Sequence, residues 1–126
     1  MNLKDYFESK KGLAVLSTVD SSGRVNSAVY SRPHVVSDTE VAFIMADRKS
    51  HENIQANPHA AYLFKEEGEK YIGKRLSLTR TREEEDSEVI DSMRRKDYAD
   101  LHSADKKRYL VYFAVDEVLP LIGKGE

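Results

Sequence analysis

The residues with the clearest potential for chemistry lie where a predicted strand gives way to a predicted helix. The apolar segment 41–45 is followed by the basic pair Arg48 and Lys49, and a polar helix is expected to begin at Ser50. Free backbone N–H groups and the helix dipole attract anions at the start of a helix. The two cationic side chains and the Ser50 hydroxyl add further donors. This junction therefore predicts a phosphate-binding site.

A purely structural interpretation of the same junction stays open. Ser50 then serves only as the N-cap of the helix, and Arg48 and Lys49 are solvated loop charges.

A second segment, from Asn26 to Pro33, carries small polar residues on a predicted strand, which would let a ligand lie flat against the backbone. The alternative for that segment is an ordinary, partly exposed strand.

The remaining polar residues give weaker signals. No metal-binding spacing relates the four histidines, His34, His51, His59 and His102. His51 lies near the predicted anion site, but we expect a surface position on the helix. The acidic run at 83–86 is expected to be a solvated first helical turn, because consecutive helical residues point in different directions. Motifs of serine hydrolases, P-loop proteins and Rossmann folds are missing from the sequence.

Short apolar segments rich in β-branched and aromatic residues predict the strands that position these side chains. Polar turn residues separate them, and the part of the chain from Leu13 to Met45 predicts three or four strands in an antiparallel meander. The predicted strands cover residues 13–19, 25–29, 41–45, 60–64, 71–79 and 109–115.

Three short helices are predicted beside these strands. Residues 2–11 place apolar side chains at helical spacing, and residues 50–57 form a second helix that ends before Pro58. A capping box from Thr81 to Glu84 predicts the start of a third helix, which would continue to about residue 101. About six strands with short helices predict a mainly β protein, closed into a small barrel because closure removes exposed strand edges.

Composition narrows the classes of function. The 126 residues fit a single domain spanning 1–126, and the lack of cysteine excludes a thiolate nucleophile and a disulfide framework. The net charge of −2 does not favour a nucleic-acid partner. No segment approaches the roughly 20 apolar residues of a membrane span, so no membrane partner is expected. The N-terminal segment lacks the apolar region of a secretory signal, which predicts a cytoplasmic protein.

The order of these segments resembles the pyridoxamine 5′-phosphate oxidase-like family of FMN-binding split barrels. The resemblance covers residues 12–64 well and the rest of the chain in outline. It rests on residues 12–20 with Gly23, residues 43–45, Lys49-Ser50 with Asn53-Ile54, and Asn57-Pro58. It implies a six-stranded antiparallel split β-barrel, a homodimer, and FMN at the dimer interface.

The resemblance also implies three groups of cofactor-binding residues. The phosphate of FMN would be held at the strand–helix junction by Arg48, Lys49, Ser50 and Asn53. The edge of the isoalloxazine ring would meet the backbone of Ser27, Ala28 and Val29. The other side of the ribityl chain would be lined by Ile44, Met45 and Ala46.

The function implied is that of a small, redox-active FMN-binding flavoprotein. Ala28 stands where the vitamin-forming oxidases carry arginine, so oxidation of pyridoxamine phosphate itself is not expected. One alternative is a non-catalytic module on the same barrel that binds or senses flavin, haem or a deazaflavin. His34, His51 or His59 would then be the candidate haem ligands. Another alternative is a cofactor-free dimeric barrel that binds a protein.

Overall fold

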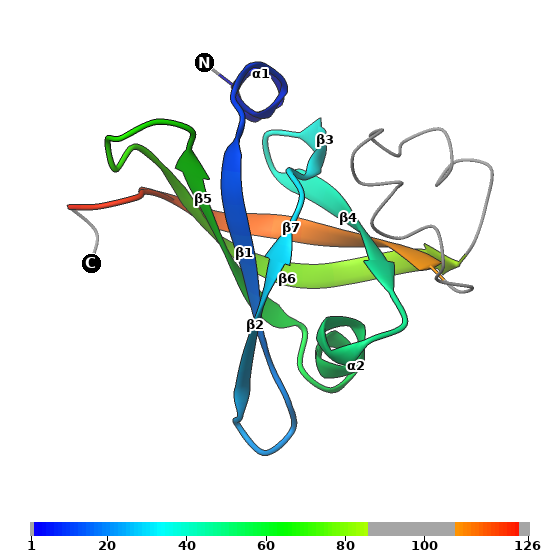
Figure 1. Cartoon of the computed structure of the whole chain (residues 1–126). Coiled ribbons are helices and arrows are strands. Elements are labelled where there is room, and N and C mark those ends of the chain that lie inside the picture. Colours follow the sequence, from blue (N-terminus) through cyan, green and yellow to red (C-terminus); the bar gives the residue numbers. More distant parts are fainter. Residues whose placement is uncertain (1, 86–107, 124–126) are drawn as a thin grey trace.

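The chain folds into one strongly curved antiparallel sheet with a short helix at each of two opposite ends (Figure 1). The computed structural model describes residues 2–85 and 108–123, and within them the sheet has seven strands. The elements are α1 (Leu3–Ser9), β1 (Gly12–Val19), β2 (Val25–Tyr30), β3 (His34–Ser37), β4 (Glu40–Ala46), α2 (Lys49–Ala56), β5 (His59–Glu66), β6 (Gly73–Glu85) and β7 (Arg108–Pro120).

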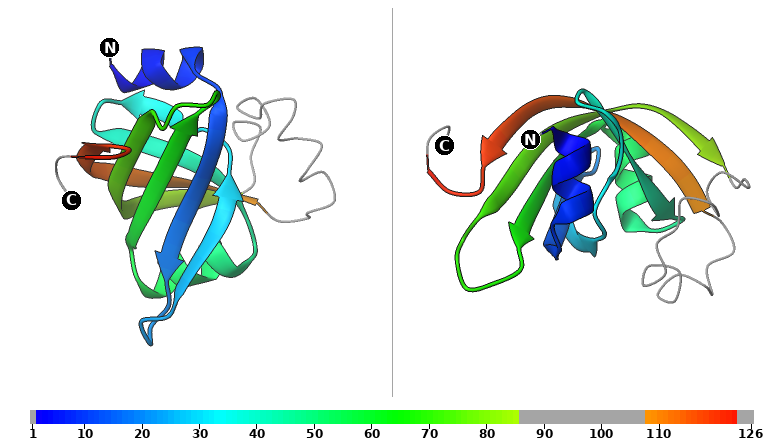
Figure 2. Two further views of the ribbon diagram at one scale, coloured as in Figure 1. Left: turned by 60° about the vertical axis from the view of Figure 1, so that its left-hand side comes forward. Right: turned by 90° about the horizontal axis from the view of Figure 1, so that it is seen from above.

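The strands follow the order β2-β1-β5-β6-β7-β4-β3, so β2 and β3 are the two edges of the sheet. The predicted meander is therefore wrong in one link. The pairs β1–β2 and β3–β4 are hairpins, but the chain crosses from one edge to the other between β2 and β3. Pro33, in this link, has no N–H to donate to a strand ladder. The curvature is seen in Figure 2.

The predicted fold class, a mainly β split barrel, is confirmed, with two differences. Strand β3 has only four residues, too few for its alternation to stand out in the sequence, and it raises the strand number from six to seven. The ladder is also not closed, because β2 and β3 do not pair. The barrel is split along these two edges.

Alternation along the strands builds the core inside the curved sheet. In β5, for example, Tyr62 and Phe64 are fully buried, whereas Leu63 between them points outward. Helix α1 closes one end of the core with Leu3, Tyr6 and Phe7, as its helical spacing predicts. Asn2 caps this helix by accepting a hydrogen bond from the backbone N–H of Asp5, at 2.8 Å.

The predicted third helix does not begin at Thr81. Residues Thr81 to Glu85 continue β6 and pair with β7, with Glu83 opposite Val111. Cross-strand pairing with the apolar β7 outweighs the local capping signal. The remainder of that predicted helix lies outside the described residues. The other end of β6 also differs from the prediction, since the strand begins at Gly73 and Tyr71 is exposed.

Candidate cofactor site

A pocket of about 260 Å³ lies between the edge strand β2 and the junction of β4 with α2. It lies between the two segments from which the sequence predicts ligand binding, residues 26–33 and the strand–helix junction at residues 48–50. The lining residues are Asn26, Ala28, Val29, Tyr30, Ala46, Arg48, Lys49 and Ser50.

Strand β2 forms one wall of the pocket. Its alternation turns Asn26, Ala28 and Tyr30 to the partly buried side, while Ser27 faces outward and shares a hydrogen bond with Ser17 at 2.7 Å between the two Oγ atoms. The ring of Tyr30 meets Phe43 edge to face, with 5.9 Å between the ring centroids. The wall therefore combines small side chains with one aromatic ring that the core supports.

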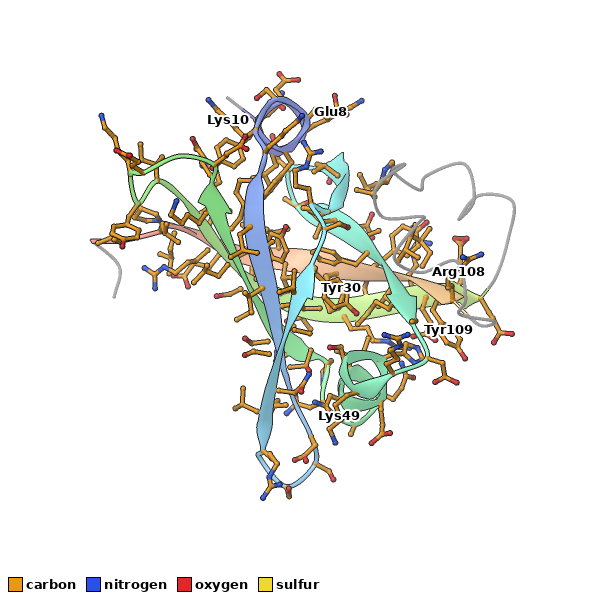
Figure 3. All side chains as sticks on the ribbon, viewed as in Figure 1. Glu8, Lys10, Tyr30, Lys49, Arg108 and Tyr109 are labelled. Atoms are coloured by element: carbon orange, nitrogen blue, oxygen red, sulfur yellow. The ribbon has the colours of Figure 1, made fainter. Side chains whose placement is uncertain are left out.

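The start of α2 forms the opposite wall. The helix begins at Lys49, one residue before the predicted start, and Arg48 is the N-cap residue, which makes no capping hydrogen bond with its side chain. The alternative interpretation, in which Ser50 is the N-cap, is therefore wrong. Ser50 lies in the first turn and is only 5% exposed. Lys49 is the first helical residue, and its side chain is half exposed on the side of α2 that faces the β1–β2 hairpin (Figure 3). Backbone N–H groups, a hydroxyl and two cations thus border the same pocket.

Two carboxylates lie near the Lys49 ammonium. Glu52, one turn along α2, lies 3.8 Å from Lys49 Nζ. Asp20, in the β1–β2 turn, accepts hydrogen bonds from the backbone N–H of Arg24 and from Ser22; these bonds, with a smaller contribution from the charge of Lys49, lower the pKa of Asp20. An anion that enters the pocket would compete with Glu52 for Lys49.

Six of the ten residues predicted to bind the cofactor line this pocket, and the structure also brings Asn26 and Tyr30 into it. The period-two alternation about Ala28 was the signal that could have identified these two residues. The four predicted residues that do not line it are Ser27, Ile44, Met45 and Asn53.

Each of these four has a structural reason for its position. Ser27 lies on the outer side of β2. Met45 is fully buried in the core, and Ile44 points to the other face of β4, where it packs with Leu110. Asn53 is 1% exposed and donates from Nδ2 to Thr18 at 3.1 Å, so it joins α2 to β1.

His51 was expected on the surface but is 7% exposed. Its imidazole lies flat on the ring of Tyr109, with centroids 3.9 Å apart and planes 7° apart. Its Nε2 is 3.1 Å from the carboxylate of Glu83. The expectation of a solvated acidic turn is therefore wrong for Glu83, which belongs to β6 and also accepts hydrogen bonds from Gln55 and Arg80.

Two other classes of site were sought over residues 2–85 and 108–123. In those ranges no group of three or more His, Asp or Glu side chains is arranged to hold a metal ion. The same ranges contain no helix with the length and apolar character needed to cross a membrane.

No protein-family model and no curated protein sequence matches the chain, but solved structures do. An FMN-binding protein from Syntrophomonas wolfei has a TM-score of 0.76 at 18% identity, over 97% of this chain and 85% of its own. HutZ, the haem storage protein of Vibrio cholerae, has a TM-score of 0.69 at 19% identity, over 94% of each chain.

A third similar structure is a protein of the pyridoxinephosphate oxidase family from Clostridium acetobutylicum, related to general stress protein 26 of B. subtilis. It has a TM-score of 0.64 at 12% identity, over 92% of this chain and 83% of its own. Identities this low establish the fold alone. The chain therefore has the fold of the pyridoxamine 5′-phosphate oxidase-like, FMN-binding split barrels, as the sequence resemblance predicted.

Proposed function

We propose that this chain is an FMN-binding flavoprotein that acts as a homodimer in electron or hydride transfer. The observation that carries the proposal is the pocket between β2 and the first turn of α2, in which Lys49, Ser50 and Arg48 meet the small side chains of the edge strand. The Syntrophomonas wolfei protein of the same fold binds FMN, which supports this choice of cofactor.

The donor set fits the phosphate of FMN. A phosphate ester is an anion with several acceptor oxygens, and the start of α2 offers a helix dipole, backbone N–H groups and the Ser50 hydroxyl. Lys49 and Arg48 supply positive charge, since both line the pocket. Charge-assisted hydrogen bonds of this kind are worth roughly 1.5–3 kcal/mol each.

The β2 wall fits a flat ring. Ala28 leaves the backbone accessible, and Asn26 offers both donors and acceptors at the same wall. The apolar Ala46 and the ring of Tyr30 complete the lining with surfaces suited to an aromatic system. The isoalloxazine ring would therefore lie along β2, with the phosphate at α2.

The pocket is too small to enclose a whole cofactor. Its volume of about 260 Å³ lies below the roughly 300–1,000 Å³ of pockets that bury most of a ligand. A second surface is needed to cover the ring, and we assign that role to a second copy of the chain.

The outer face of β2, β1 and β5 has the character of a dimer interface. Val29, Val15 and Leu63 form one cross-strand row, in which Val29 is 71% exposed and Leu63 is 42% exposed. Val25 and Leu13 extend this apolar face along the same strands. Contiguous exposed apolar surface marks interaction sites, and β2 connects this face directly to the pocket.

The bound flavin would supply the hydride and electron chemistry itself. The residues of the chain bind and orient it: the first turn of α2 holds the phosphate, and β2 sets the plane of the ring. We assign no acid or base residue, because that chemistry resides in the cofactor.

Titration of the purified protein with FMN tests the proposal. Binding should change the flavin fluorescence with one FMN per chain, and Lys49→Ala should weaken affinity by about tenfold or more. Lys4→Ala, which removes an exposed lysine of α1 at the other end of the barrel, is the matched control. Fluorescence that stays that of free FMN, or equal affinities for the two variants, would contradict the proposal.

Haem is a second candidate, favoured by one specific observation. The Thr79 hydroxyl donates to Asp116 and so accepts from His59 Nδ1 at 3.2 Å; in a neutral ring, Nε2 is then the nitrogen with the lone pair, and His59 is an exposed residue of β5. HutZ, with the same fold, is a haem storage protein. A visible spectrum of the purified protein separates the cofactors, because haem gives a Soret band and flavin gives two broad bands at longer wavelength.

A further inference from the structure

We propose that His51 is a positioning residue that, together with Glu83, fixes the first turn of α2 and so holds Lys49 and Ser50 at the pocket. The proposal rests on the proposed function, because that turn is where the phosphate would bind. None of the atoms of His51 lines the pocket. Its role would be exerted through the helix.

Few interactions within helix α2 stabilise the position of its first turn. It has eight residues, and the side chain of its N-cap, Arg48, makes no capping hydrogen bond. Isolated helices shorter than about 12 residues are marginal in water, and a helix whose first turn has no capping side chain is less stable still. The position of the first turn must therefore come from contacts with the sheet.

His51 supplies that contact within the first turn itself. Its ring stacks on Tyr109 of β7 at 3.9 Å, and its Nε2 reaches Glu83 of β6 at 3.1 Å. Figure 3 shows Tyr109 and Lys49 on different sides of α2. The contact with β6 and β7 thus lies away from the pocket, on the flank where no ligand would replace it.

Glu83 is a fixed partner. Its Oε1 accepts from Gln55 Nε2 at 2.8 Å and from Arg80 at 3.3 Å, so two other side chains hold the carboxylate. Burial raises the pKa of Glu83, but the hydrogen bonds from Gln55 and His51 and the charges of His51 and Arg80 outweigh it and lower the pKa. An ionised carboxylate only accepts hydrogen bonds, so His51 Nε2 carries the hydrogen and donates.

His51 is joined to the pocket through the backbone of α2, since it directly follows two pocket residues in the chain. Lys49, Ser50 and His51 are consecutive in one turn, so a shift or rotation of that turn moves all three together. Asn53 and Ile54 anchor the helix further along, against β1 and the core. Without the His51 contact, the helix would keep its middle in place while its first turn loosened.

Two measurements on matched variants test this role. His51→Phe keeps a ring against Tyr109 but removes the donor, whereas His51→Gln places an amide nitrogen close to the position of Nε2. We expect the amides of residues 52–54, which donate hydrogen bonds back to the first turn, to exchange faster with solvent in apo His51→Phe, and FMN affinity to fall by about tenfold. His51→Gln should restore both. His34→Gln, in β3, is the control histidine.

The outcomes separate this proposal from the proposed function. If the unmodified protein binds FMN and His51→Phe matches it in affinity and exchange, the positioning role is overturned. If the unmodified protein does not bind FMN, the proposed function fails, and the exchange of the amides of residues 52–54 alone decides whether His51 holds the turn. Should His51→Phe not fold, Glu83→Leu, which removes the acceptor, replaces it. Faster exchange of these amides in Glu83→Leu supports the role, and unchanged exchange overturns it.

Discussion

Asn53 donates a hydrogen bond from Nδ2 to the Thr18 hydroxyl oxygen, at 3.1 Å, across the buried contact between α2 and β1. Both side chains are almost fully buried, and the amide oxygen Oδ1 of Asn53 makes no hydrogen bond within the described part of the chain. The resemblance implies that Asn53 contacts the phosphate. In the structure its side chain instead joins helix α2 to strand β1.

Asn53→Ala should therefore act on stability. We expect the free energy of unfolding to fall by about 1–3 kcal/mol, because the Thr18 hydroxyl loses its buried partner. The FMN affinity of the folded protein should change much less than in Lys49→Ala. Urea unfolding and a fluorescence titration measure the two effects. A variant with unchanged stability and sharply weaker FMN binding would return Asn53 to the phosphate site.

Glu52→Gln should strengthen FMN binding. Glu52 lies 3.8 Å from Lys49 Nζ and would compete with the phosphate for that ammonium. Both side chains are exposed, so we expect a gain of only about twofold to fivefold in affinity, diminishing at high salt. Glu69→Gln, in the β5–β6 turn, is the control for the change in net charge. An affinity that falls would show that Glu52 supports the site.

Leu63→Arg should break the proposed dimer. Leu63 is 42% exposed in the apolar row formed with Val15 and Val29, and a buried, unpaired guanidinium would oppose association. Sedimentation should then give a monomer with weakened FMN binding. Val36→Arg, at the other edge of the sheet, is the matched control and should stay dimeric. A Leu63→Arg protein that remains a dimer would place the interface elsewhere.

The lowered pKa of Glu83 predicts an acid dependence of stability. A carboxylate whose folded pKa lies below its unfolded value stabilises the fold fully above the unfolded pKa, 4.5, and loses that contribution as pH falls through the folded pKa. The difference in unfolding free energy between the unmodified protein and Glu83→Gln should therefore be constant well above pH 4.5 and shrink as the pH falls through that value and below it. A difference that stays constant with pH contradicts this assignment.

Gly12→Ala should destabilise the sheet. A Cβ at this position would fall 2.0 Å from the Lys65 carbonyl oxygen, a backbone atom of β5 that has little freedom to move away. We expect a loss of about 1–3 kcal/mol in urea unfolding, in the range of overpacked substitutions. Gly73→Ala, where the Cβ would lie 1.9 Å from the Phe64 carbonyl oxygen, should behave alike. Native stability in both variants would mean that the strand ends separate easily.

Most of the fold could be predicted because its signals are local. Leu3, Tyr6 and Phe7 sit at helical spacing, and alternation in β5 sets Tyr62 and Phe64 inside. Where a local signal competed with a distant one, the prediction failed. The capping box at Thr81 is sound by itself, but pairing with β7 some 30 residues later decides the conformation.

The candidate site, too, was predictable where its signals are local in the sequence and not where they depend on distant contacts. The cationic junction and the small residues of β2 are visible in the sequence, and the pocket brings them together. The interior position of His51 was not visible, because it depends on Tyr109 and Glu83, which are far from His51 in the chain. Ile44 and Met45 show a further limit: a strand covered on both faces gives no alternation by which to choose the side that meets a ligand.

Strand β2 forms a wall of the pocket and yet, among the strands that the structure describes, has a single hydrogen-bonded neighbour, β1. Inner strands such as β5 are constrained by two neighbours and by the core, so their side chains are hard to exchange. On an edge strand, residues such as Asn26 and Ala28 can be substituted while the other strands keep their register. The residues of β2 that would contact a ligand are thus distinct from the inner strands that stabilise the fold. The edge strand β2 is therefore a suitable place to redesign ligand specificity.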